Sequence, residues 1–209
     1  MNFDEPFFPF RAAALAVIAA FYAVYFIKAF AQKRRGIKTR QIGSRKEKGL
    51  HTVETLMSAA TFGIVFAQIF SICAGWNYLP EVVRYIGLTI GIIGDAVFLA
   101  AVLCMKDSWR AGIPEKDKTK LVTGGIYKIS RNPAFLGFDL SYTGMLLLYF
   151  NPLLAAFTVF AVVMLHLQIL QEEKFMKATF GAEYCEYKAR VCRYLGIKPR
   201  KKTVIRGSF

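Results

Sequence analysis

Five long apolar stretches divide the chain, and polar, mostly basic segments separate them. Because about 20 apolar helical residues span the hydrocarbon core of a bilayer, and about 17 suffice at the short end, each stretch is long enough to cross a membrane. A soluble helical bundle would need polar stripes at helical spacing, which these stretches lack. The pattern therefore predicts an all-α integral membrane protein with five transmembrane helices, covering residues 12–31, 56–79, 85–105, 134–150 and 153–171.

The basic residues give this topology a direction. Of the 28 lysines and arginines, 8 lie in residues 32–51, 7 in 106–132 and 10 in 172–209. Lysine and arginine collect in cytoplasmic loops, so these three segments are expected on the cytoplasmic side, with the N-terminus outside and the C-terminus inside. The net charge of +14 then reflects topology and attraction to anionic membrane lipids. Nucleic acid is not an expected partner, because no folded recognition module accompanies the charge.

The composition does not favour a metal centre or a disulfide. The chain has only two histidines, and its four cysteines show no CxxC spacing. Two of them, Cys185 and Cys192, fall in the segment that is expected to be cytoplasmic, where thiols stay reduced.

Three features between the first and third spans have mainly structural interpretations. Residues 33–48 carry eight cations and no apolar stripe, which is typical of a solvated loop at the headgroups. Gly87, Gly91 and Gly94 lie at spacings of four and three, so they predict a close helix–helix contact. Asp95 lies near mid-span, where it either faces a polar cavity or forms a structural hydrogen bond.

Residues 120–137 combine a basic loop with the start of a helix. Proline is well tolerated at the first helical position, so Pro133 predicts that a helix begins there. Arg131 and Asn132 then lie at the helix mouth, where backbone N–H groups and the helix dipole favour an anionic ligand.

The last two spans form a hairpin, since Asn151 and Pro152 leave room only for a tight turn. Their distal ends are therefore neighbours, which brings His166, Gln168, Glu172 and Glu173 toward the level of Arg131. A break is expected at residues 180–181. The aromatic stripe that follows, beginning with Tyr184 and Tyr187, either anchors the chain at the membrane surface or caps the pocket.

Two motifs in this half carry a family resemblance. Residues 127–137, YKISRNPAFLG, resemble the GxYxxxRHPxYxG motif of the isoprenylcysteine carboxyl methyltransferase and phospholipid methyltransferase superfamily of integral membrane methyltransferases. Residues 172–193 resemble the closing EExxxxxxFGxxYxxYxxxVxR of that superfamily. The resemblance covers about the last 90 residues, and it divides the chain into three N-terminal spans, 1–105, and a methyltransferase core, 106–209.

The resemblance implies an enzyme that binds S-adenosyl-L-methionine on the cytosolic side and methylates a lipophilic or lipid-linked substrate from the membrane. Arg131 and Asp139 are the candidate catalytic residues, with Asp139 either a base or a structural hydrogen-bonding group. Gln168 is the candidate substrate contact. The implied cofactor contacts are Lys120, Leu121, Val122, Tyr127, Asn132, Pro133, Ala134, Phe135 and Glu172.

Three departures from the superfamily pattern bear on function. Asn132 replaces the usual histidine and Phe135 the usual tyrosine. Gln168 stands where members that act on isoprenylcysteine have an arginine for the substrate carboxylate, so a neutral lipophilic acceptor is expected. Two other functions stay open, a non-catalytic lipid-binding relative and an NADPH-dependent enzyme like the membrane sterol reductases.

Overall fold

The structure is a computed structural model that describes residues 9–41, 48–111, 113 and 120–199. Part of the basic connector, the region around Lys116 and the tail from residue 200 onward lie outside the described residues. Predictions about the placement of those parts therefore remain predictions.

The described chain is helical, which confirms the all-α prediction for these residues. Outside the helices, isolated β-bridges pair Arg40 with Ala111 and Val191 with Ile197. The long helices are α1, Pro9–Arg34; α2, Lys48–Ala74; α3, Glu81–Met105; α4, Pro133–Leu148; and α5, Pro152–Arg190, and two 3₁₀ turns are η1, Lys106–Ser108, and η2, Gly125–Lys128.

Four of the helices, α1, α2, α3 and α5, are long and apolar enough to cross a membrane. The fourth helix in chain order, α4, is apolar but has only 16 residues. At 1.5 Å per residue it is about 24 Å long, a little short of the hydrocarbon core. Four long candidate spans and one shorter apolar helix thus stand where five spans were expected.

The helix starts at the two prolines are confirmed, but the second span is shifted from its expected position at 56–79. Helix α2 begins at Lys48 and ends at Ala74. Gly75 follows with a φ of +66°, the left-handed conformation that ends many helices. The helix therefore takes in polar residues before the apolar stretch and stops before Trp76.

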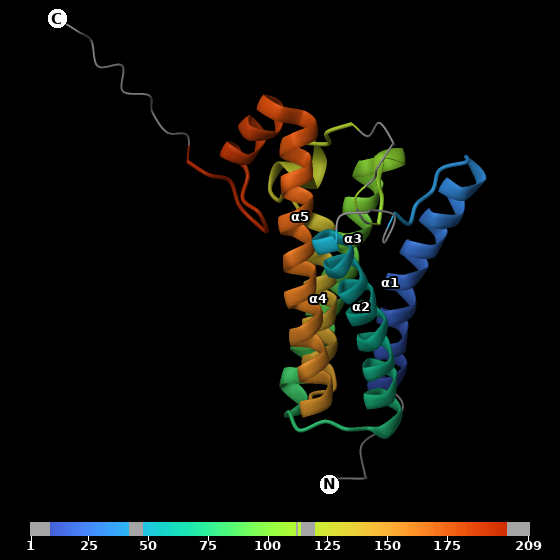
Figure 1. Ribbon diagram of the computed structural model, residues 1–209. Coiled ribbons are helices and arrows are strands. Elements are labelled where there is room, and N and C mark those ends of the chain that lie inside the picture. The colour runs from blue at the N-terminus through green and yellow to red at the C-terminus, as the bar shows by residue number, and fades with distance from the viewer. Residues whose placement is uncertain (1–8, 42–47, 112, 114–119, 200–209) are drawn as a thin grey trace, which may run out of the picture.

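The three basic segments share one end of the bundle, as predicted, in their described parts. The N-terminal end of α1, the α2–α3 loop and the α4–α5 turn lie at the other end (Figure 1). At the basic end, the backbone N–H of Gln41 donates to the carbonyl of Ala111 at 2.8 Å. The N–H of Arg131 donates to the carbonyl of Cys192 at 3.1 Å. Connector, central loop and C-terminal segment are thus tied together.

Helices α3 and α4 pack with their backbones in near contact, as the glycine spacing predicts. A Cβ atom added to Gly94 would lie 2.5 Å from the backbone nitrogen of Ser141 and 2.9 Å from the carbonyl oxygen of Gly137. One added to Gly87 would lie 2.7 Å from the carbonyl oxygen of Gly144. Because α4 begins at the candidate site, this contact fixes that site relative to α3.

Of the two roles that the sequence left open for Asp95, a polar cavity or a structural hydrogen bond, the structure shows the hydrogen bond. The Ser141 hydroxyl of α4 donates to its carboxylate at 3.4 Å.

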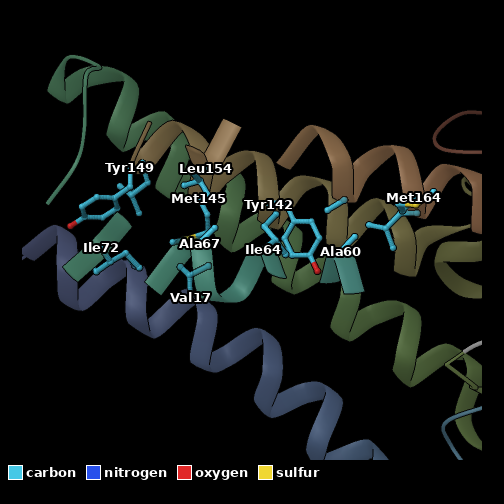
Figure 2. Packing of buried hydrophobic residues seen from close by; sticks show 14 of the residues in the cluster. Val17, Ala60, Ile64, Ala67, Ile72, Tyr142, Met145, Tyr149, Leu154 and Met164 are labelled. Atoms are coloured by element: carbon cyan, nitrogen blue, oxygen red, sulfur yellow. The ribbon is translucent and has the colours of Figure 1, made fainter. Parts of the chain in front are cut away.

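The hydrophobic core is formed by apolar side chains from α1, α2, α4 and α5. Figure 2 shows this packing, with Val17, Ile64, Met145 and Leu154 among the labelled residues.

We expect Gly94→Ala to destabilise the protein by about 1–3 kcal/mol, because the added methyl group meets backbone rather than a movable side chain. Thermal unfolding in detergent measures the effect. Gly49→Ala is the matched control, since a Cβ there meets nothing within 4 Å. Equal melting temperatures for the two variants would contradict the close α3–α4 contact.

Candidate functional site

The site is built around the start of α4. Pro133 is the first helical residue, and Asn132 occupies the position before it. The C-terminal segment crosses this mouth: the Asn132 side-chain amide donates to the carbonyl of Arg193 at 3.1 Å, and the Gly196 N–H donates to the carbonyl of Ile129 at 2.7 Å. The loop before α4 is therefore hydrogen-bonded to the C-terminal segment at both Ile129 and Asn132.

Glu173 is the buried centre of an ion cluster that locks this arrangement. Its carboxylate lies 3.0 Å from Nη1 of Arg131, and both side chains are nearly inaccessible, 6% and 4% exposed. Arg193 donates two hydrogen bonds to it, at 2.9 and 3.0 Å, and Lys188 approaches to 3.3 Å. The hydrogen bond with Glu173 raises the pKa of the Arg193 guanidinium, which keeps that cation charged.

A bend in α5 brings an aromatic lid over the mouth. Gly181 has non-helical angles, with a φ of +51°, at the position where the sequence predicts a break. Beyond it, Tyr187 donates to the carbonyl of Tyr127 at 2.7 Å, and Arg131 donates to the hydroxyl of Tyr184 at 3.1 Å. Burial raises the pKa of Tyr127 well above its usual value, so the phenol stays neutral. Of the two alternatives for the aromatic stripe, its first two tyrosines cap the pocket.

A cavity of about 710 Å³ lies beneath this lid. Its volume falls within the range of small-molecule sites. Most of the residues that the sequence singles out line it: Lys120, Leu121, Val122, Tyr127, Arg131, Asn132, Ala134, Phe135, Gln168 and Glu172. Among the described residues, Pro133 and Asp139 do not line the cavity.

Asp139 lies near Tyr194 and not in the cavity wall. Burial and the nearby Asp139 carboxylate raise the pKa of Tyr194, whose hydroxyl lies 2.7 Å from Nδ1 of His166. His166 and Tyr194 do not line the cavity in the part of the chain that the structure describes either. The structure therefore does not bring Asp139 together with the other candidate residues.

The cavity has a polar end and an apolar end. The polar end is the mouth beneath Tyr184 and Tyr187. The apolar end lies between α1 and α2, where α1 leans away from the rest of the bundle (Figure 1). Phe26, Phe62 and Phe66 line this end and are also 62%, 59% and 72% exposed on the outer surface. Exposed aromatic side chains on candidate membrane spans form an opening suited to an apolar ligand.

Buried polar groups mark the wall where α5 meets α2. Gln168 is fully buried and donates to Glu172 at 3.3 Å. Its side-chain oxygen has no hydrogen-bond partner among the described residues, and neither does Nε of Arg131. Glu54 of α2 is also fully buried and close enough to Glu172 for their charges to interact. The Gln168 oxygen and Nε of Arg131 can therefore form hydrogen bonds with a ligand in the cavity.

Sequence reasoning missed two of these features and the role of a third. The superfamily motif draws attention to Glu172, whereas its neighbour Glu173 holds the ion cluster. Glu54, near the expected start of a span, lies in the second turn of α2 and faces α5. Arg40 lines the cavity although its segment resembles a solvated loop. The hairpin of the last two spans predicts that Glu173 lies near Arg131, but no sequence signal indicates the contacts of Glu54 or Arg40.

Comparisons with known proteins agree with this architecture. The family model described as phospholipid methyltransferase matches residues 82–183. A probable protein-S-isoprenylcysteine O-methyltransferase of Oryza sativa subsp. indica is 35% identical over 112 residues, which are 52% of this chain and 59% of that protein. Protein-S-isoprenylcysteine O-methyltransferase B of Arabidopsis thaliana is 29% identical over 168 residues, which are 68% of this chain and 84% of that protein.

A solved structure of a eukaryotic intramembrane Ras methyltransferase, isoprenylcysteine carboxyl methyltransferase, has the same fold. It superposes with a TM-score of 0.64 at 20% identity and covers 94% of this chain and 71% of that one.

The described residues thus form a helical bundle with four candidate membrane spans and a cavity whose mouth lies at the basic end. The comparisons confirm the resemblance to the isoprenylcysteine carboxyl methyltransferase and phospholipid methyltransferase superfamily. The chain matches about three fifths of the length of the rice relative, 59%.

We expect Glu173→Gln to destabilise the protein by about 3–5 kcal/mol, because the change leaves the buried Arg131 cation without its carboxylate. Thermal unfolding and limited proteolysis of the C-terminal segment measure the loss. Glu183→Gln is the control, because Glu183 is an exposed carboxylate that lies beyond the Gly181 bend and takes no part in the ion cluster. Equal stability and equal proteolysis of the two variants would exclude the ion cluster as the lock.

Proposed function

We propose that this protein is an S-adenosylmethionine-dependent methyltransferase that acts on a lipophilic, membrane-borne acceptor. One observation carries the proposal: a single cavity joins a charged mouth at the start of α4 to an aromatic opening between α1 and α2. A polar cofactor and an apolar acceptor can therefore reach the same space from different sides.

The residues of the mouth fit S-adenosylmethionine, which has an amino-acid group, a ribose and an adenine. The partnerless Nε of Arg131 and the N–H groups at the start of α4 suit a carboxylate. Glu172 suits an ammonium or a ribose hydroxyl, and Tyr127 offers an aromatic face. When bound, the cofactor supplies a methyl group on a sulfonium, whose leaving group is already strong.

The chain's own task is then mainly one of alignment. Tyr184 and Tyr187 cover the mouth, so they exclude water from the cavity. The ion pair with Glu173 holds Arg131 in one position, and Asn132 is fixed by the carbonyl of Arg193. Restricting both reactants in this way converts a bimolecular reaction into an effectively unimolecular one.

The acceptor that we propose is a lipid-like or lipid-linked molecule. The relatives are named for methylating protein-S-isoprenylcysteine, an apolar chain on a polar head, and the exposed phenylalanines of the opening suit such a chain. Asp139 lies away from the cavity, so we assign it no part in the reaction.

We further propose that α4 crosses the membrane with the other four helices, paired with α5 as a hairpin. On this topology the N-terminus is outside, and residues 106–132 and 172–199 are cytoplasmic. Residues 106–209 form the methyltransferase core, while α1 and α2 from the first 105 residues add the lateral walls of the cavity.

The cofactor proposal predicts that the purified protein binds S-adenosylmethionine and that Glu172→Ala weakens binding about tenfold, since a charged hydrogen-bond partner is lost. Calorimetry in lipid nanodiscs measures both, with the exposed Glu183→Ala as control. A thermal-shift comparison of S-adenosylhomocysteine with NADPH tests the alternatives. Stabilisation by NADPH alone would favour a reductase, and stabilisation by neither would favour a lipid-binding relative.

The topology proposal predicts opposite sides for the two ends of the bundle. Single cysteines at Lys38 and Lys198, in a chain whose native cysteines are replaced by serine, should react with an impermeant thiol reagent from the cytoplasmic side. A cysteine at Tyr78, in the α2–α3 loop, should react only from the opposite side. Labelling of Lys38 and Lys198 positions from different sides would overturn the arrangement.

A further inference from the structure

We propose that the C-terminal hairpin, residues 191–197, docks into the cytoplasmic leaflet of the membrane and contacts its anionic lipids. Its residues do not line the cavity, so this surface adds a lipid partner to the proposed function. The proposal rests on the proposed topology, in which the basic end of the bundle is cytoplasmic.

The backbone of the C-terminal hairpin is held in one position. An antiparallel bridge pairs Val191 with Ile197, and the N–H of Cys192 donates to the carbonyl of Gly196 at 2.9 Å. The N–H of Gly196 in turn donates to the carbonyl of Ile129 at 2.7 Å. The hairpin is therefore closed on itself and attached to the loop before α4.

Three large apolar side chains are exposed on this surface. Leu195 and Ile197 flank Gly196 and are 64% and 67% exposed, and Ile129 is 43% exposed. Because the hydrogen bond from Gly196 joins the two segments, the three side chains belong to one apolar patch. Single exposed apolar residues are common on proteins, but a patch next to candidate membrane spans is expected to contact an apolar phase.

A contact with α5 places the hairpin at the level of the bilayer. The hydroxyl of Tyr194 lies 2.7 Å from Nδ1 of His166, and the two rings stack with their centres 6.0 Å apart. His166 is 14 residues beyond Pro152, so it lies about 21 Å along α5 from the opposite end of the bundle. With Pro152 at one face of a hydrocarbon core of about 30 Å, His166 lies inside the other face.

The hairpin therefore reaches the boundary between hydrocarbon and headgroups. In Figure 1 the described end of the chain, drawn in red, turns back alongside α5 at this level. Tyrosine suits such a boundary, because its ring is apolar and its hydroxyl needs a polar partner. Tyr184 and Tyr187 of the aromatic stripe cap the mouth, whereas Tyr194 takes the interfacial position.

Cations lie behind the apolar residues. The N–H of Lys198 donates to the carbonyl of Arg190 at 2.8 Å at the base of the hairpin. Both side chains are exposed, and so is that of Lys128 in the loop before α4. Apolar residues at the tip and cations at the base match the order of a leaflet, with hydrocarbon inside and anionic headgroups outside. Since lysine is depleted in protein–protein interfaces, a lipid fits this surface better than a protein does.

The docking surface is also connected to the candidate site. Arg193 belongs to the hairpin and donates to Glu173 at 2.9 Å, while its carbonyl accepts from the side chain of Asn132 at 3.1 Å. A hairpin seated in the leaflet therefore restrains the ion cluster and the start of α4 through direct contacts.

The test measures the depth of the hairpin by spin labelling. Leu195→Cys and Ile197→Cys are made singly in a chain whose native cysteines are replaced by serine, and each carries a nitroxide in lipid nanodiscs. Oxygen concentrates in hydrocarbon, whereas a neutral nickel chelate stays in water, so the ratio of their collision rates with the nitroxide reports its surroundings. We expect oxygen collisions to dominate severalfold at both positions.

Two further labels calibrate this ratio. Val163→Cys, 11 residues beyond Pro152 on α5 at a 50% exposed position, should be dominated by oxygen. Glu186→Cys, at an exposed position beyond the Gly181 bend, should be dominated by the nickel chelate. Melting temperatures like that of the unlabelled chain show that each labelled protein is folded.

Three outcomes would overturn the proposal. Dominance of the nickel chelate at Leu195→Cys and Ile197→Cys, with oxygen dominant at Val163→Cys, would place the hairpin in water and leave the proposed topology intact. Dominance of the nickel chelate at Val163→Cys would reject the topology as well. Few collisions with either reagent at the hairpin labels would show that protein, such as a second copy of the chain, covers the patch.

Lipid charge tests the cations. Adding phosphatidylglycerol to phosphatidylcholine nanodiscs should raise the ratio of oxygen to nickel collisions at the Leu195→Cys label, because the anionic headgroups attract the base of the hairpin. The increase should disappear when Lys128→Gln and Lys198→Gln are combined. It should remain with Lys177→Gln, which removes an exposed cation farther along α5. A ratio that does not depend on lipid charge would overturn the assignment of anionic lipid as the partner.

Discussion

The basic end of the bundle depends on one buried carboxylate. Glu173 gathers Arg131 from the loop before α4, and Lys188 and Arg193 from beyond the bend at Gly181. Arg131 precedes α4, whereas Lys188 and Arg193 follow the Gly181 bend, so the cluster joins segments that are far apart in the sequence. Burying the charges costs desolvation energy, but the three cations more than offset it at Glu173, whose pKa lies below its usual value. The cluster therefore fixes one geometry. The lid, the mouth of α4 and the C-terminal segment keep their relative positions because of it.

A second constraint acts from below. The glycine contacts join α3 to α4 by backbone, and packed helix backbones leave no side chain that could rotate to absorb a displacement. The mouth therefore has a rigid floor, while its cover is held by ion pairs and by the two tyrosines past Gly181. The cover is packed as well, because Tyr184 and Tyr187 belong to a buried apolar cluster with Ala101 and Val191. Base and cover of the site are therefore both held by buried contacts.

Much of the fold follows from the sequence, because the features that fix it are local or periodic. Apolar length predicts the helices, and Pro133 marks where α4 starts. The side chains that form the cavity are less predictable. Glu172 and Glu173 are adjacent, yet they face different partners about 100° apart around α5, a difference that depends on helix rotation. Arg40 is harder still, since its position depends on pairing with Ala111, far along the chain, and its own segment has the composition of a solvated loop.

The opening lined by exposed phenylalanines between α1 and α2 determines which concentration controls how much acceptor occupies the cavity. A ligand that reaches the cavity through this opening is drawn from the surrounding lipid, so its relevant concentration is its mole fraction in the bilayer and not its amount per volume of buffer. Adding water to such a sample would leave saturation unchanged, whereas adding lipid would dilute the ligand in two dimensions. The cofactor entering at the mouth would obey ordinary bulk concentration, so the two ligands of one cavity would follow different laws of dilution.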